Sequence, residues 1–157
     1  MQISSVRAQP AMRRMYLIDT HVISEMRKRE KADRGVQSFF RQAAERDESL
    51  YLSVVTVGEL RRGIDLIQHR GDRPQADLLE RWLSTLLEQH GDNILAFDTD
   101  AAQVWGRLRV PHPEHEIDKQ IAAIALVHDL IVVTRNEAHF RPTGVGVLNP
   151  FAGLQAA

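Results

Sequence analysis

The chain has 157 residues, no cysteine, 43% hydrophobic residues and a formal net charge of −1. This length is typical of one domain, which can bury roughly two thirds of its unfolded surface without a disulfide or a structural metal. The absence of cysteine excludes thiol catalysis and zinc–thiolate sites and fits a reducing compartment. Apolar runs are only a few residues long, so we expect a cytoplasmic protein with no membrane-spanning helix.

The first residues differ from the rest of the chain. Residues 1–14 carry Arg7, Arg13 and Arg14 but no apolar segment, so they do not resemble a secretory signal. We expect a disordered extension over residues 1–14, or a true start at Met12 or Met15. A single domain is predicted over residues 15–151, with a short C-terminal tail over 152–157.

Apolar strands alternate with amphipathic helices along this domain. We predict strands over residues 15–18, 50–53, 94–97, 130–133 and 145–148. Helices are predicted over residues 22–46, 56–69, a stretch through Trp82 and Leu87, 100–109 and 117–128, with a polar break at 71–74 and a Pro-rich loop at 111–113. The alternation predicts an α/β fold, a three-layer α/β/α sandwich with a mostly parallel central sheet.

Three acidic residues stand where predicted elements begin or end. Asp19 directly follows the first strand, at the sheet edge where ligands of parallel α/β folds collect. Glu59 lies in the early turns of the second helical segment, near its positive end, and Asp118 opens the last long helix. Each also has a structural explanation: Asp19 as a helix N-cap, Asp118 as a first-turn helix charge, and Glu59 as part of a solvated helix face.

Taken as a set, the three carboxylates predict a site for a hard divalent cation. Mg²⁺ and Mn²⁺ prefer oxygen ligands, and Mg²⁺ takes only one or two carboxylates while it keeps several waters. Without a cation, neighbouring carboxylates repel one another. Bound ions can activate water and stabilise the leaving oxygen in phosphodiester hydrolysis. We therefore predict Asp19, Glu59 and Asp118 as metal ligands and catalytic residues.

Four ordered segments, YLIDTHVISEMRK, SVVTVGELRRGI, DKQIAAIAL and IVVTRNEAHF, are followed by VGVLNPF. From about Met12 to Phe151 the chain resembles a PIN domain of the VapC toxin class, and within that class its FitB-like branch. The resemblance implies a PIN-like sandwich and an endoribonuclease that depends on Mg²⁺ or Mn²⁺. It also implies the toxin of a type II toxin–antitoxin pair, with RNA as substrate, a small cognate antitoxin that blocks the cleft, and a homodimer.

The resemblance also assigns site residues. It matches Asp19, Glu59 and Asp118 to the metal-site acids of the family. It matches Thr134 and Asn136 to the TRN motif beside that site, where they would position a water or the phosphate.

Two positions depart from the family pattern. The usual Asp-Thr-Asn reads Asp19-Thr20-His21, and His139 stands where an acid is expected near the end of the TRN segment. Neutral imidazole can bind a borderline metal such as Mn²⁺ or orient a water, although histidine is also an ordinary surface residue. The missing fourth acid motivates an alternative, a catalytically weak PIN-like module that acts by binding antitoxin or nucleic acid.

Several other residues have mainly structural interpretations. We expect Glu25 to pair with a nearby arginine, and Asp98 or Asp100 to cap the following helix. Trp82 and Trp105 lie on amphipathic helices, which favours core or dimer packing over base stacking. His112 and His115 flank Pro113 without helical spacing, which predicts an exposed loop rather than a zinc site.

Basic residues gather at a few places and are either phosphate contacts or solvated helix faces. These are Arg27, Lys28, Arg29 and Lys31, then Arg61 with Arg62, and also Lys119 and Arg135. The chain has no Gly-rich dinucleotide fingerprint, no phosphate-binding Walker loop and no Gly-x-Ser-x-Gly nucleophile elbow.

Overall fold

A computed structural model describes residues 13–152. The strands are β1 (Met15–Ile18), β2 (Ser49–Ser53), β3 (Ile94–Leu95), β4 (Ile131–Val133) and β5 (Val147–Leu148). The α-helices are α1 (Thr20–Met26), α2 (Arg34–Glu45), α3 (Val54–His69), α4 (Arg73–Gln89), α5 (Thr99–Leu108), α6 (Glu116–His128) and α7 (Glu137–Phe140). Short 3-10 helices cover Arg29–Lys31, Gly91–Asn93, Arg141–Thr143 and Pro150–Ala152.

The strands form one sheet in the order β3-β2-β1-β4-β5, and every pairing is parallel. From the central strand β1 the chain winds outward to β2 and β3, then crosses back and adds β4 and β5 on the other side. The winding direction therefore reverses between β1 and β4. In open α/β sheets, ligands bind outside the carboxyl ends of the strands at such a switch point.

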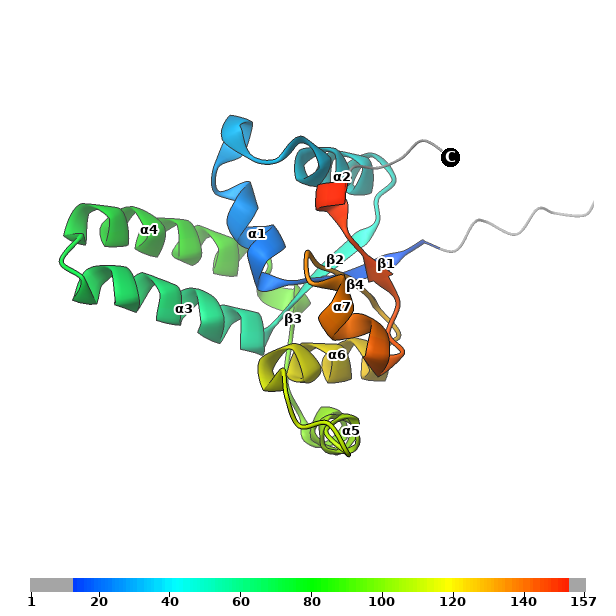
Figure 1. Cartoon of the computed structure of the whole chain (residues 1–157). Helices are drawn as coiled ribbons and strands as arrows, with labels where there is room; N and C mark the ends of the chain where they lie inside the picture. Colours follow the sequence, from blue (N-terminus) through cyan, green and yellow to red (C-terminus); the bar gives the residue numbers. More distant parts are fainter. Residues whose placement is uncertain (1–12, 153–157) are drawn as a thin grey trace, which may run out of the picture.

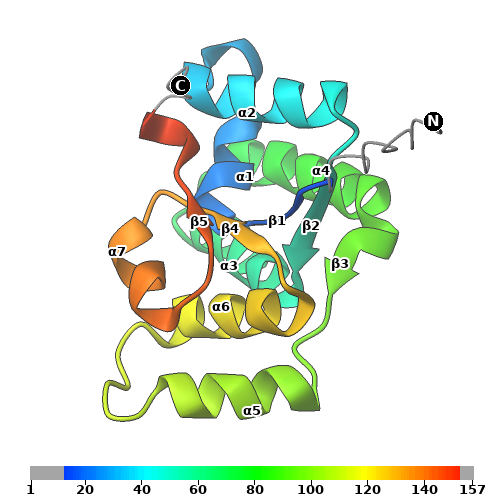
Figure 2. The ribbon, with the colours of Figure 1, turned by 90° about the vertical axis from the view of Figure 1, so that its right-hand side faces the viewer.

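Helices cover both faces of the sheet, and the two faces have separate cores (Figure 2). Tyr16 and Ile18 of β1 face a core built with α1, α2, α3 and α4. Leu17, between them, faces the opposite core, where α6 contributes Ile121 and Ile124 and α7 contributes Phe140. This alternation explains why β1 is apolar throughout, because a strand covered on both faces has no solvent side. The predicted three-layer α/β/α sandwich is confirmed.

Helices α3 and α4 form an antiparallel pair that extends away from the sheet (Figure 1). The turn between them contains Gly71 at φ 93°, a left-handed conformation that glycine adopts without a Cβ penalty. Asp72 caps α4 by accepting a hydrogen bond from the backbone N–H of Gln75. Across the pair, Arg61 donates from Nη2 to Glu80 Oε1 at 2.8 Å.

The structure differs from the sequence-based prediction mainly in the short elements. The segment 22–46, predicted as helical, is divided into α1, a 3-10 turn and α2, because Asp33 starts a new helix by capping Gly35 and Val36. Strands predicted over 94–97 and 145–148 shorten to β3 and β5, and α7 was not predicted. Most of the predicted N-terminal extension and C-terminal tail lies outside the described residues. Within residues 13–152, no helix combines the length and apolar character needed to cross a bilayer.

Candidate metal centre

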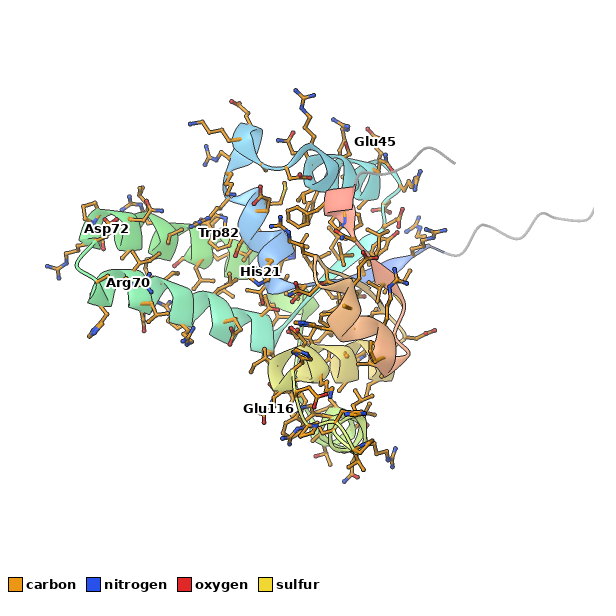
Figure 3. All side chains as sticks on the ribbon, viewed as in Figure 1. His21, Glu45, Arg70, Asp72, Trp82 and Glu116 are labelled. Atoms are coloured by element: carbon orange, nitrogen blue, oxygen red, sulfur yellow. The ribbon has the colours of Figure 1, made fainter. Side chains whose placement is uncertain are left out.

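A cavity of about 310 Å³ opens at the carboxyl edge of the sheet, beside the switch point. Asp19, Glu59 and Asp118 all line it, and they come from three different elements: the end of β1, α3 and α6. Trp82 of α4 and His21 at the start of α1 also line the cavity, and both are labelled in Figure 3. The structure thus brings the three predicted metal ligands to one cavity.

Asp19 is held on both sides of its carboxylate. Its Oδ1 accepts a hydrogen bond from the backbone N–H of Thr20 at 2.8 Å, which makes it the N-cap of α1. Its Oδ2 accepts from Thr134 Oγ1 at 2.7 Å. The predicted capping role and the cavity position therefore coincide, because the residue that ends β1 also starts α1. Both bonds fix the direction in which the carboxylate points.

The environment of Asp19 disfavours its charge. Only 3% of the residue is exposed. Burial is the main reason why the pKa of Asp19 is raised above its ordinary value, and the nearby Asp118 carboxylate raises the pKa further. The hydrogen bonds from Thr134 and Thr20 act in the opposite direction and do not outweigh burial. A cation bound at this carboxylate would offset both the burial and the repulsion from Asp118.

Thr134 and Asn136 lie behind this carboxylate. Thr134 is fully buried after β4, and its Oγ1 accepts from the backbone N–H of Asn136 at 3.0 Å while it donates to Asp19. Neither Thr134 nor Asn136 is among the described residues that line the cavity. In this structure Asn136 contributes its backbone N–H, so its predicted side-chain contact with a water or phosphate stays a prediction.

Glu59 lies in the second turn of α3, on the face of the helix toward the cavity. Gly63 follows it by one turn and also lines the cavity, so no side chain fills the space beside the carboxylate. Ser53 caps α3 through the backbone N–H of Thr56 at 3.0 Å. The hydroxyl of Thr20 bonds that of Thr56 at 3.2 Å, which ties the start of α1 to the start of α3.

Asp118 lies in the first turn of α6 and has a close histidine partner. Its Oδ2 is 2.7 Å from Nδ1 of His139, and the His139 ring stacks on that of His115 with centroids 3.7 Å apart. One ligand atom from each of these three residues lies within 4.8 Å of the others. Among residues 13–152, Asp19 and Glu59 are not part of a group this tight.

The residues at the cavity fit a hard divalent cation. Three carboxylates from separate elements supply oxygen donors, and the most buried of them, Asp19, has a raised pKa that a cation would offset. Because these three carboxylates do not form a group within 4.8 Å of one another, an ion held by Asp19, Glu59 and Asp118 would draw them closer or reach one of them through a water.

Comparison with known proteins identifies the fold family. Residues 16–144 match the PIN domain. The chain belongs to the PIN-domain family.

Curated relatives agree with this placement. They include Plasmid stability protein StbB of Pseudomonas syringae pv. tomato at 36% identity, VapC ribonuclease Y4jK of Sinorhizobium fredii at 32%, and Toxin FitB of Neisseria gonorrhoeae at 34%. Each alignment covers 87% of this chain and 98% or 99% of the relative. The crystal structure of FitAcB from Neisseria gonorrhoeae superposes with a TM-score of 0.75 at 32% identity, covering 87% of this chain and 99% of that chain. The predicted resemblance to the VapC class and its FitB-like branch is confirmed.

Several residues around the PIN-domain cavity were not predicted as its lining. Thr20 and Ser24 of α1 line it, together with Arg27, the C-cap of that helix. Their spacing of four and three residues places them on the same side of a helix that starts at the sheet edge, and this is the signal from which they could have been found. Arg27 brings a positive charge to the cavity. His21 also lines it.

The other predicted basic contacts have different outcomes. Lys28 pairs with Glu25 at 2.8 Å, and Arg61 pairs with Glu80. Lys119 is buried and donates to the backbone carbonyl of His112, which removes it from the candidates for phosphate contact. Among the residues of the predicted basic clusters, Arg27 lines the cavity.

The structure shows the contacts of four residues for which the sequence predicted a structural role. Glu25 has a basic partner, but the partner is Lys28 rather than an arginine, and Glu25 also accepts from the backbone N–H of Asp33 at 2.9 Å. Asp98 caps α5 through the backbone N–H of Ala101 at 2.9 Å. Trp82 packs against the core shared by α1 to α4. Trp105 packs edge-on against Phe97 and donates from Nε1 to the carbonyl of Glu116 at 3.2 Å.

Proposed function

We propose that this PIN-domain protein is a metal-dependent endoribonuclease and the toxin component of a type II toxin–antitoxin system. The observation that carries the proposal is the convergence of Asp19, Glu59 and Asp118 on one cavity beside the switch point of the sheet. The names VapC ribonuclease and Toxin FitB among its relatives support the same conclusion. Mg²⁺ is the proposed cofactor, and Mn²⁺, which also prefers oxygen donors, can replace it.

A divalent ion supplies Lewis acidity, which lowers the pKa of a water and stabilises charge on a phosphoryl oxygen. The chain contributes position and charge. Thr134 and the backbone of Thr20 hold the Asp19 carboxylate in one orientation. Glu59 and Asp118 provide the opposing oxygens from α3 and α6. Arg27 gives the cavity a cation that can contact a phosphate of bound RNA.

The proposed partners follow from the toxin assignment. A toxin of a type II pair is held inactive by a small antitoxin, and the cavity with its acidic lining is the surface that such a partner would block. A Lys or Arg side chain from the antitoxin would pair with the acids in place of the metal. We also propose that two copies of this chain form a homodimer and that the protein acts in the cytoplasm.

Cleavage of a mixed pool of cellular RNA tests the proposal. Purified protein is incubated with Mg²⁺, with Mn²⁺ or with a chelator, beside Asp118→Asn. We expect cuts that require the metal and disappear in the variant. Folded protein that makes no cut with either metal would refute the nuclease assignment.

The alternative function is a PIN-like module that binds antitoxin or nucleic acid without efficient cleavage. One observation favours it: His139 stands at the position of the fourth acid and bonds Asp118, so one carboxylate of the site is engaged by a histidine. Folded protein that binds a cognate antitoxin but leaves RNA intact with both metals would support this alternative.

A further inference from the structure

We infer that His115, Asp118 and His139 form a second metal site, made of two imidazoles and one carboxylate, which binds a borderline divalent transition metal such as Zn²⁺ or Co²⁺ in preference to Mg²⁺. Their ligand atoms lie within 4.8 Å of one another. Asp118 lines the acidic cavity, whereas His115 and His139 do not, so the cluster lies beside the cavity and shares one residue with it.

The type of donor distinguishes this cluster from the acidic cavity. Two imidazole nitrogens and one carboxylate are the ligand set of many zinc and non-haem iron sites, and such sites keep positions open for water or substrate. Mg²⁺ prefers oxygen ligands and binds imidazole poorly. A site with two nitrogen donors therefore favours Zn²⁺ or Co²⁺, whereas Asp19 and Glu59 retain the oxygen donors that suit Mg²⁺.

The loop that carries His115 is fixed by several contacts. Buried Lys119, one turn into α6, donates to the backbone carbonyl of His112. Glu116, the residue after His115, makes two further contacts. Its backbone carbonyl accepts from Trp105 Nε1 at 3.2 Å, and its carboxylate pairs with Arg109 at 3.0 Å. These contacts join α5, the loop and α6. His115 is consequently presented beside Asp118 by a held backbone rather than by a free loop.

The backbone of His115 is itself unusual. It adopts φ 59° and ψ 48°, the left-handed region, which costs a residue with a side chain roughly 1–2 kcal/mol. Arg29, Asp47 and Asp129 adopt this conformation as well, so the dihedral angles alone assign no function. At His115 they coincide with the ring stack on His139, and strained residues of this kind concentrate at functional sites.

The side chains can reach a common metal with small movements. His139 faces Asp118 through Nδ1, so a metal bound to this nitrogen and to the Asp118 carboxylate would replace the hydrogen that the two groups share. The rings of His115 and His139 lie 21° from parallel, and two imidazoles that share a metal must turn so that their ring planes meet at it. His115 is exposed, so its ring can rotate without displacing buried atoms. Asp118 also lines the acidic cavity, so the two sites would share this residue.

Metal binding to the protein without RNA tests the inference. Zn²⁺ is titrated calorimetrically, and Co²⁺ is followed by its visible absorption, in the wild type, His115→Ala and His139→Ala. We expect each variant to lose at least about tenfold in Zn²⁺ affinity, since even indirect partners of metal ligands contribute about 10–100-fold. The Mg²⁺ affinity of His115→Ala should equal that of the wild type, because the carboxylates of the cavity and the contact between His139 and Asp118 are intact in this variant.

His112→Ala is the matched control. His112 lies on the same exposed loop, and its side chain is not part of the cluster. We expect this variant to bind Zn²⁺ and Co²⁺ as the wild type does. Equal Zn²⁺ affinity in the wild type, His115→Ala and His139→Ala would overturn the inference, and so would a loss in His112→Ala as large as in His115→Ala. Because binding is measured without RNA, neither result depends on nuclease activity.

Discussion

Thr134 donates its hydroxyl hydrogen to Asp19 Oδ2 at 2.7 Å, across the boundary between β4 and β1. The two residues are 115 positions apart in sequence, yet each directly follows one of two paired strands. Because parallel strands end at the same edge, the sheet itself sets the distance between the hydroxyl and the carboxylate. The same hydroxyl accepts from the backbone N–H of Asn136, so its hydrogen is committed to Asp19.

Replacing Thr134 by valine keeps the shape and removes the hydroxyl. We expect Thr134→Val to lower the free energy of unfolding by about 1–3 kcal/mol, because it removes one of the two hydrogen bonds to the buried carboxylate of Asp19 and leaves the N–H of Asn136 without a partner. Metal affinity should fall as well, since the carboxylate is no longer oriented. Thr134→Ser is the control that retains the hydroxyl. Denaturant unfolding and calorimetric titration with Mn²⁺ measure both effects, and equal losses in the two variants would show that the methyl group, not the hydrogen bond, is responsible.

Asp19 makes the stability of the metal-free protein depend on pH. Its folded-state pKa is raised, so the native state binds the proton more tightly than the unfolded chain does. By linkage, this contribution is fully present below the unfolded value of about 3.9 and is lost as the pH rises through the folded-state pKa. In chelator, we therefore expect the wild type to lose stability relative to Asp19→Asn as the pH rises through this window.

The comparison with Asp19→Asn cancels the titration of the acids and histidines that do not interact with Asp19, because both proteins share these groups. Asparagine is as good an N-cap as aspartate, so the start of α1 is retained in the variant. Urea unfolding at a series of pH values provides the measurement. The role assigned to burial would be contradicted if the difference in the free energy of unfolding between the two proteins stayed constant, or if it grew in favour of the wild type as the pH rises.

Metal binding should stabilise the native state through the same carboxylate. A cation at 100 times its dissociation constant adds about 2.7 kcal/mol by mass action. We expect Mn²⁺ and Mg²⁺ to raise the melting temperature of the wild type and to have little effect on Asp19→Asn. Asp100→Asn, at an exposed position in the first turn of α5, is the control that should respond like the wild type. A similar rise in Asp19→Asn would remove Asp19 from the ligands.

Gly63 offers a test of the cavity itself. No atom lies within 4 Å of a Cβ placed at Gly63 or at Gly58, and only Gly63 lines the cavity. Because glycine weakens a helix interior, either Gly→Ala change should stabilise the protein by about 0.5–1 kcal/mol. Gly63→Met should reduce RNA cleavage by filling the space beside Glu59, whereas Gly58→Met should not. If both methionine variants cleave RNA equally, the substrate does not enter beside Gly63.

Much of this fold can be predicted from the sequence because β1 is buried on both faces and α3 and α6 are long. Their apolar patterns place Asp19, Glu59 and Asp118 at the strand end or in the early helical turns where the structure has them. Alternation of strands and helices also predicts the parallel sheet. Short elements escape this reasoning: β3 and β5 have two residues each, and α7 has four, which is too few for a period to be recognised.

The side-chain contacts of the site depend on tertiary structure. His115 sits on a Pro-rich loop with no periodicity, and the sequence predicts only an exposed position for it. Its stack on His139 arises because the loop is held against α5 and α6. Lys119 looks like a phosphate contact in the sequence, but it is buried and holds this loop.

The central claim is that Asp19, Glu59 and Asp118 hold the ion that promotes attack of water on an RNA phosphodiester. Cleavage of one labelled RNA with Mg²⁺ by Asp19→Asn, Glu59→Gln and Asp118→Asn, beside the exposed control Glu45→Gln, tests it most directly when the product ends are identified. We predict that each site variant loses cleavage, that the control retains it, and that the products carry no 2′,3′-cyclic phosphate because water rather than the 2′-hydroxyl attacks. Full cleavage by the three variants, or cyclic phosphate ends from the wild type, would contradict the account.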